Sequence, residues 1–382
     1  METLTLNETR ERRSETRNSI QWKQLWSLAA LYGSIIIGWI AYQNYQPKLL
    51  VQFHFSDFTF LLMAAQGLIL VITPMIAGAL GDRYRLEKGH RIPIISSGIS
   101  FAAMIFMAVA FTLLGNPGEV FRWILPVLIV FWLIAMSIFT SPALSTIELF
   151  TSVDKLPHAM AILTITGNLI YSLEPVIVDI IDYLGAPATF VAGGVVTFLS
   201  GYALKKNSLQ LFRESGDREA RSPQAELLNS RYGLIFFPGL CVGIATTLLF
   251  YFFPSVPGDT LALVFNTDTK IIVVAILIVS ALLSWPMSHV VNRYGMERIF
   301  WISSTVIGLS VLAIYFSTSA VLISLLTVIF AIAFTALSVA ALPLAIHRSA
   351  FRQKVFCVGL FFSGVALPEA VWEALQAWGT QA

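Results

Sequence analysis

Long apolar segments alternate with short polar ones along almost the whole chain. Eleven of these segments are long enough for a helix to cross a bilayer, which takes about 20 apolar residues at a rise of about 1.5 Å each. They cover residues 25–46, 58–80, 92–114, 123–145, 158–178, 186–204, 232–253, 269–290, 299–316, 319–341 and 354–376. The pattern predicts an all-α, polytopic membrane protein.

The composition supports this interpretation. Hydrophobic residues make up 57% of the 382 residues and charged residues only 12%, whereas soluble domains carry roughly 25% charged residues. Membrane lipid is therefore the expected surrounding of most of the surface. The net charge of +2 is small, and no nucleic-acid partner is expected.

The positive charges indicate how the chain is oriented. All but three of the 24 Lys and Arg residues fall in segments that would lie on one side of the membrane, the exceptions being Lys48, Arg122 and Lys270. Cytoplasmic segments of membrane proteins carry an excess of Lys and Arg. Residues 1–24 are therefore predicted to form a cytoplasmic tail, with the C-terminus outside, in a multi-pass protein of a bacterial inner membrane or a plasma membrane.

One hydrophilic segment divides the ladder of apolar runs. Residues 205–231 contain Gly216, Pro223 and charges of both signs, which is typical of a linker. The predicted organisation is a six-helix bundle over 25–204 and a five-helix bundle over 232–382. Repeated membrane bundles are the architecture of many transporters, with the site between the halves near the middle of the membrane.

A short motif follows the second predicted helix and returns in altered form after the eighth. The two copies read Gly78-x-Leu80-x-Asp82-Arg83 and Asn292-Arg293-Tyr294-Gly295. With the repeated bundles, the motif resembles the major facilitator superfamily of transporters. The continuation from Gly89 to Pro93 resembles two of its branches, the glycoside–pentoside–hexuronide cation symporters and the light-harvesting-complex assembly proteins.

The chain departs from that family pattern in three places. The family normally has twelve helices, and the last is not predicted here. Asn292 stands in the second motif where the family has Asp. Ser141 precedes Pro142 where the symporters have Arg, and such an Arg could contact a substrate or an acid.

The resemblance also implies a latch between helices on the cytoplasmic side. Asp82 would face the start of the eleventh helix, and Arg83 would reach Glu148 at the end of the fourth. The candidate latch residues are Gly78, Asp82, Arg83, Arg91, Glu148 and Arg293. The alternative is that these are ordinary interfacial charges.

Two acids within predicted spans are candidates for ion coupling. Glu174 precedes Pro175 in the fifth helix, and Glu369 follows Pro368 in the eleventh. A charged side chain inside a span costs about 2.5–3.5 kcal/mol on insertion scales, so it is a functional candidate. A carboxylate there could carry a proton or coordinate a sodium ion. The alternative is that both acids lie in the outer third of the membrane and face water.

The remaining candidates are polar or aromatic side chains that could bind a solute or join helices by hydrogen bonds. They are Tyr42, Gln43, Asn44, Gln66, Asn168 and Trp285. The histidines show no metal-binding spacing, and no nucleotide-binding loop or catalytic triad is suggested. No enzyme activity, metal or other cofactor is therefore expected.

These patterns favour a secondary-active transporter, ion-coupled or facilitative, that moves a small solute such as a sugar by alternating access. The second hypothesis is a transporter-like protein that assists assembly or handles pigment for other membrane proteins. The missing twelfth helix, the altered second motif and the absence of Lys or Arg deep in any span favour it. An open central cavity lined by Tyr42, Asn168 and Trp285 favours transport, and a cavity filled by Phe and Leu favours the alternative.

Overall fold

The computed structural model describes residues 19–52, 59–115, 123–219, 230–255 and 269–379. Within these ranges every regular element is a helix. Ten helices are long and apolar enough to cross a membrane, or eleven if the bent pair Val153–Ser172 and Glu174–Leu184 forms one span. The predicted all-α, polytopic membrane architecture is confirmed.

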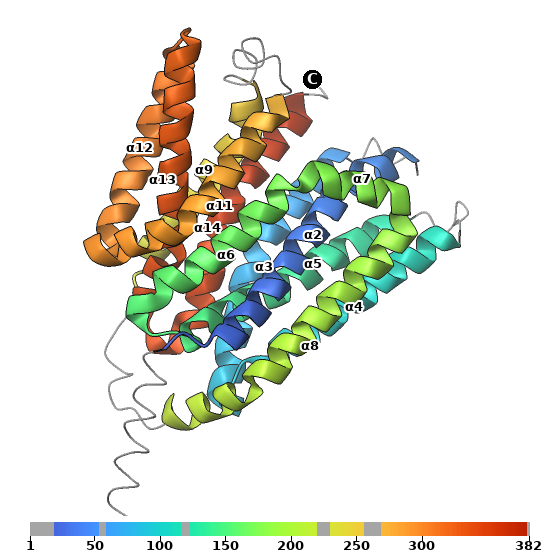
Figure 1. The fold of residues 1–382 in the computed structure, drawn as a ribbon. Coiled ribbons are helices and arrows are strands. Elements are labelled where there is room, and N and C mark those ends of the chain that lie inside the picture. The colour runs from blue at the N-terminus through green and yellow to red at the C-terminus, as the bar shows by residue number, and fades with distance from the viewer. Residues whose placement is uncertain (1–18, 53–58, 116–122, 220–229, 256–268, 380–382) are drawn as a thin grey trace, which may run out of the picture.

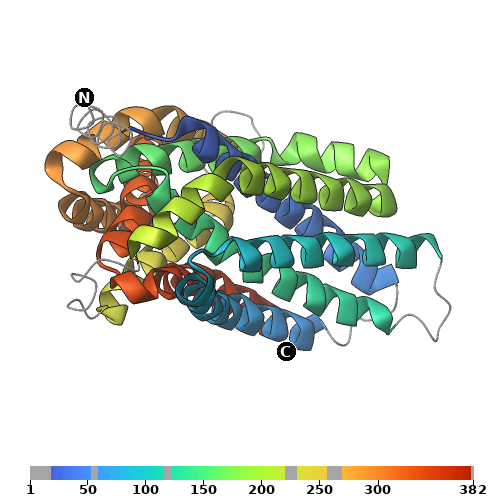
Figure 2. The same cartoon turned by 90° about the horizontal axis from the view of Figure 1, so that it is seen from below.

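The helices gather into two groups that lie side by side (Figures 1 and 2). The first group consists of α2 (Trp22–Gln52), α3 (Thr59–Lys88), α4 (Ile92–Leu114), α5 (Ile124–Leu144), α6 (Leu156–Ser172), α7 (Glu174–Leu184) and α8 (Ala186–Glu219). The second consists of α9 (Tyr232–Thr247), the π-helical turn η5 (Leu248–Phe252), α11 (Thr269–Tyr294), α12 (Met296–Phe316), α13 (Ala320–His347) and α14 (Lys354–Gly379). The 3₁₀ turns are η2 (Ser145–Leu149), η3 (Val153–Lys155) and η6 (Phe351–Gln353).

Two helix pairs provide most of the packing between the groups. They are α3 against α14 and α6 against α11. Within the first group α4 packs on α5 and α8, and within the second α13 packs on α11 and α12. The two inter-group pairs therefore decide which side chains can meet between the groups.

The helix boundaries differ from the predicted ones at two points. The helix α8 continues to Glu219, so the first part of the segment interpreted as a linker is helical. The fifth predicted span is broken, with α6 and α7 meeting at 59°. Pro175 at the start of α7 cannot continue the hydrogen-bond ladder of α6.

The α3–α14 pair is in backbone contact, which small residues make possible. A Cβ atom added to Gly78 would lie 2.5 Å from the Val355 carbonyl oxygen, and one added to Gly359 would lie 2.1 Å from that of Pro74. Farther along, a Cβ atom on Gly67 would lie 2.8 Å from that of Ala370. We name this run of contacts the α3–α14 seam.

Replacing Gly359 with Ala should destabilise the protein, because the obstructing atom belongs to backbone and the helices must separate. Overpacking of this kind costs about 1–3 kcal/mol, so the midpoint of thermal unfolding in detergent should fall by several degrees. Gly308→Ala in α12 is the matched control, since its Cβ would meet nothing within 4 Å. Equal midpoints for the two variants would contradict this account of the seam.

Candidate functional site

A cavity of about 490 Å³ lies between the two groups of helices, within the 300–1,000 Å³ range of small-molecule sites. Its polar lining consists of Gln43, Gln46, Gln66, Ser137, Thr140, Ser141, Glu174, Thr246, Glu369 and Glu373. Its aromatic lining consists of Trp39, Tyr171, Phe250, Tyr251 and Phe362. The cavity is therefore polar, aromatic and acidic at once.

Breaks in helices bring several of these residues to the cavity. Glu174 begins α7 directly after the 59° bend. A carboxylate at a helix N-terminus is favoured by the helix dipole. Phe250 and Tyr251 lie in the π-helical turn that ends α9, and such turns are frequent at functional sites. Glu369 and Glu373 lie one turn apart on α14, so they share a face.

The Gln66 amide links helices of both groups. Its oxygen accepts hydrogen bonds from the Tyr42 hydroxyl at 2.7 Å and from the Gln46 amide nitrogen at 3.1 Å. Its nitrogen donates to the Glu373 carboxylate at 3.2 Å. The two acceptor contacts orient the amide, so its N–H is presented to α14. This makes Gln66 a polar link between α2, α3 and α14.

Ser141 lies on the α5 side of the cavity with its hydroxyl unused. The residue is 1% exposed, lines the cavity, and its hydroxyl has no hydrogen-bond partner among the described residues. Buried hydroxyls are normally paired. An unpaired one in a cavity wall is available to a ligand.

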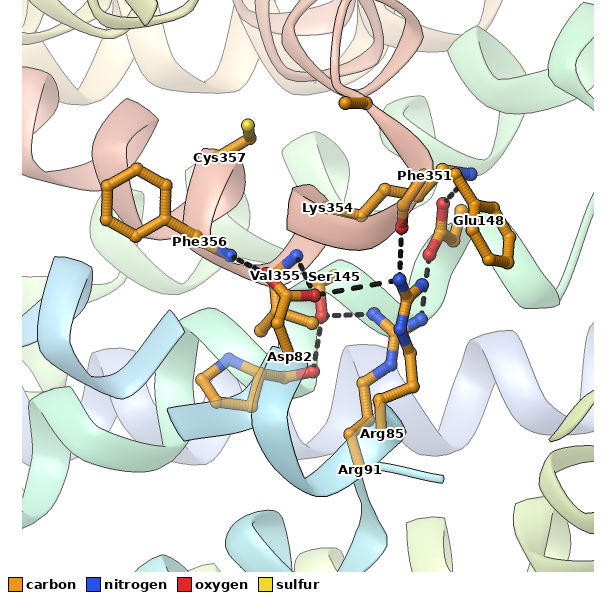
Figure 3. A network of polar contacts seen from close by, with 12 residues as sticks. Asp82, Arg85, Arg91, Ser145, Glu148, Phe351, Lys354, Val355, Phe356 and Cys357 are labelled. Atoms are coloured by element: carbon orange, nitrogen blue, oxygen red, sulfur yellow. Dashed lines mark hydrogen bonds and ion pairs between the residues drawn. The ribbon is translucent and has the colours of Figure 1, made fainter. Parts of the chain in front are cut away.

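At one end of the molecule, Asp82 of α3 holds the first turn of α14. Its carboxylate accepts hydrogen bonds from the backbone N–H groups of Val355 at 3.1 Å and Phe356 at 2.8 Å (Figure 3). These are among the N–H groups that a helix leaves unpaired at its start. Asp82 thus acts as an N-cap supplied by another helix. It is the contact that the resemblance implied for Asp82.

Beside it, Glu148 in η2 lies between two cations. Arg91 Nη2 is 2.7 Å from Glu148 Oε1, and Lys354 Nζ is 2.6 Å from Oε2. Arg91 also donates to Ser145 Oγ at 2.6 Å, and its side chain is 1% exposed. Because Lys354 begins α14, this triad ties the two groups together. We call Asp82, Arg91, Glu148 and Lys354 the latch (Figure 3), and this end of the molecule the latch end.

The expected contact between Arg83 and Glu148 is wrong. Arg83 Nε lies 2.8 Å from Glu87 on its own helix, and the Arg83 side chain is 73% exposed. Successive helical side chains are rotated by about 100°, so Arg83 turns away when Asp82 faces α14. Arg85, one turn after Asp82, faces inward and donates a hydrogen bond to the Phe351 carbonyl. The ion pair with Glu148 is formed by Arg91 instead.

The second motif makes a different contact. Arg293 is exposed, with its guanidinium 5.6 Å from the ring centre of neighbouring Tyr294. Asn292 instead lies 2.7 Å from His158 Nδ1 on α6. The first motif therefore supplies the latch, and the second joins α11 to α6 through its amide.

Of the six candidate lining residues, two line the central cavity and four do not. Gln43 and Gln66 line the cavity. Tyr42 lies behind it, stacked on Trp132 at 4.6 Å between ring centres. The other three pair elsewhere: Asn44 donates to Asp182, Asn168 to Ser280 across the α6–α11 pair, and Trp285 packs on Trp22 and His158 at the latch end.

Both candidate coupling acids, Glu174 and Glu369, line the cavity. Glu373 completes the acidic lining, and its i,i+4 spacing from Glu369 is the signal that assigns it to the same face. No comparable local signal marks Trp39, Tyr171 or Tyr251, which reach the cavity through helix packing.

Comparison with known proteins agrees with this architecture. The family model for the Major Facilitator Superfamily matches residues 28–371. The fold is similar to the crystal structure of the human organic anion transporter MFSD10 (TETRAN), with a TM-score of 0.67, 12% identity and coverage of 94% of each chain. It is also similar to the proton:xylose symporter XylE bound to 6-bromo-6-deoxy-D-glucose, with a TM-score of 0.59, 13% identity and coverage of 92% of this chain and 88% of that chain.

A sequence search of curated proteins gives no match. The structural neighbours share too little sequence to indicate more than the fold. The family match, in contrast, spans nearly the whole chain and includes the latch and all of the cavity lining except Glu373. The chain belongs to the major facilitator superfamily.

Proposed function

We propose that this protein is a secondary-active transporter that carries a small organic solute through the central cavity by alternating access. The observation that carries the proposal is the cavity itself. It holds about 490 Å³ between the two groups of helices, and its lining is rich in amide, hydroxyl and carboxylate groups. Such groups are costly within a membrane, and the binding of a polar solute explains their presence.

The latch supplies the second requirement of alternating access, a closure that can be undone. Its contacts are hydrogen bonds and ion pairs between the groups, not interlocked apolar side chains. Polar contacts can be replaced by water when the groups part. In this proposal the latch end is the closed end, and the cavity lies on the other side of the latch.

The cavity also bears on the second hypothesis, an assembly or pigment-handling role. A cavity filled by Phe and Leu would support that role. Here three carboxylates and three glutamines line the space, and this favours a polar solute over a packing or pigment-binding function.

We further propose that the latch end faces the cytoplasm, with the N-terminus inside and the C-terminus outside. Most of the basic residues of the connecting segments gather at this end, including Arg85, Lys88, Arg91 and Lys354, as the positive-inside rule requires. Lys48 and Lys270 lie at the helix ends away from the latch. Lys48 is near the end of α2, and Lys270 is at the start of α11.

Cysteine accessibility tests both proposals. Thr140→Cys, in the cavity wall, is introduced after replacing Cys241 and Cys357 with Ala. A membrane-impermeant thiol reagent should label it from outside when the latch is closed, and from the cytoplasmic side when Glu148→Gln is added. Ala102→Cys, 0% exposed in α4, is the unlabelled control. Labelling of Thr140→Cys from one side only, with or without Glu148→Gln, would contradict alternating access.

A further inference from the structure

The charge of the cavity is unbalanced on the α14 side. Glu369 and Glu373 share one face of α14 and both line the cavity. Among the described residues, the cavity lining contains no Lys, Arg or His. The third carboxylate, Glu174, interacts electrostatically with Lys270 at the start of α11. In the α14 pair, Glu373 accepts a hydrogen bond from the neutral amide of Gln66.

Three other cations near the inter-group surface are already engaged. Arg91 and Lys354 bind Glu148, and Arg85 donates to Phe351 and lies 3.8 Å from Asp82. All three are at the latch end. The carboxylate pair in the cavity therefore has no side-chain cation to neutralise it among the described lining residues.

Ser141 gives an independent indication of a ligand. Its hydroxyl is almost wholly buried, lines the cavity and has no hydrogen-bond partner among the described residues. It occupies the position before Pro142 where an Arg would have placed a positive charge in the cavity wall. The chain thus has a neutral group that can donate or accept one hydrogen bond, and it leaves the acidic pair unopposed.

The aromatic lining narrows the chemistry further. Trp39, Tyr171 and Tyr251 present rings to the same space as the carboxylates. Aromatic faces attract organic cations, most strongly where water is excluded, and they also bind apolar groups. A small inorganic cation would leave these rings without a role.

We propose, building on the transport function above, that the solute is an amphipathic organic cation. Its positive group lies at Glu369 and Glu373, its apolar body contacts the aromatic rings, and a polar substituent meets the Ser141 hydroxyl. An anion would be repelled by the carboxylate pair. A neutral sugar would form hydrogen bonds but would leave both charges uncompensated.

Benzyltrimethylammonium is the probe for this proposal, because its charge does not depend on pH. Benzylsulfonate is the anionic control and xylose the neutral one. Binding is measured by calorimetry on the full-length protein in lipid nanodiscs and by protection of Thr140→Cys from the thiol reagent. The cation should bind and protect, and the two controls should do neither at the same concentration.

Variants then locate the site. Glu369→Gln and Glu373→Gln should each raise the Kd for the cation about tenfold or more, the effect of about 1.4 kcal/mol. Asp182→Asn is the matched control, since Asp182 pairs with Lys48 outside the cavity. Ser141→Ala should leave benzyltrimethylammonium binding unchanged and weaken binding of its 3-hydroxybenzyl analogue, which carries the added hydrogen-bonding group.

Three results would overturn the cation proposal: no binding of the cation at millimolar concentration, equal binding of benzylsulfonate or xylose, or an unchanged Kd in both Gln variants. Its failure is distinguishable from failure of the transport function. If Thr140→Cys is accessible from both sides in turn but the cation does not bind, only the solute class is wrong. If accessibility never changes side, the transport function fails whichever probe binds.

Discussion

Replacing Glu148 with Gln should move the protein from the state in which the latch end is closed to the state in which it is open. The substitution leaves Arg91 buried, at 1% exposed, without its counter-charge, and it removes the partner of Lys354 on α14. The ion pair that crosses the groups is Glu148–Lys354, and a hydrogen bond to a charged group contributes about 1.5–3 kcal/mol. Conformational states of proteins commonly differ by a few kcal/mol, so a loss of this size can invert the populations.

Distances between spin labels would show the shift. Labels at Lys206 on α8 and Arg298 on α12 are exposed and belong to different groups of helices. Their distance distribution in nanodiscs should move to longer values in Glu148→Gln. The control is Glu87→Gln, the same chemical change in an exposed pair with Arg83, where little effect is expected.

Removing Lys354 separates the two halves of the triad. Lys354→Met should open the latch in part, because Asp82 still accepts the backbone N–H groups of Val355 and Phe356 across the two groups. Residues that share one network do not give additive effects, so the double variant with Glu148→Gln should shift the populations less than the sum of the single variants. Identical distance distributions in Glu148→Gln and Glu87→Gln would show that the Arg91–Glu148–Lys354 triad does not hold the latch end closed.

Replacing Glu369 or Glu373 with Gln should uncouple solute movement from a pH gradient. A bound organic cation stabilises the ionised form of both carboxylates, so the cation and a proton should compete for the pair. With one carboxylate replaced, the cation can bind without releasing a proton. Accumulation of benzyltrimethylammonium in proteoliposomes with an acidic interior should therefore be lost. Exchange of labelled for unlabelled cation at saturating concentration should continue.

The ion used for coupling follows from the same experiment. If accumulation follows a sodium gradient and disappears in the same variants, then Glu369 and Glu373 couple solute movement to sodium. Loss of accumulation in Glu174→Gln alone would place the coupling on α7 and contradict the role of the α14 pair. Parental accumulation in all three variants would exclude the cavity carboxylates from coupling.

The sequence predicts the spans well because each span is a local property. An apolar run of the required length becomes a helix in the membrane whatever surrounds it. The break between α6 and α7 is visible only in part, since Pro175 predicts a kink but not that Glu174 will end in a cavity. The sequence does not predict the helical extension of α8 beyond residue 204. Polar and charged residues there are typical of a linker, but charged pairs at i,i+4 spacing also support a helix.

The site is harder to predict because it depends on how each helix is rotated and crossed. Tyr42 and Gln43 are neighbours in sequence, yet Gln43 lines the cavity and Tyr42 packs behind it. Asn168 turns to Ser280 and satisfies its amide between helices. The motif likewise identifies the correct end of α3 but assigns Glu148 to Arg83, whereas Arg91 arrives from the start of α4.

The α3–α14 seam has a mechanical consequence. The closest approach is at Pro74, against Gly359, and this point can serve as a fulcrum. Asp82 and Gln66 lie eight residues to either side of Pro74 on α3, which makes two lever arms of about 12 Å each. If α3 and α14 rock about this point, parting at Asp82 presses on the contact between Gly67 and Ala370 and on the hydrogen bond from Gln66 to Glu373, which are already closed. Opening at the latch arm is therefore resisted at the other arm.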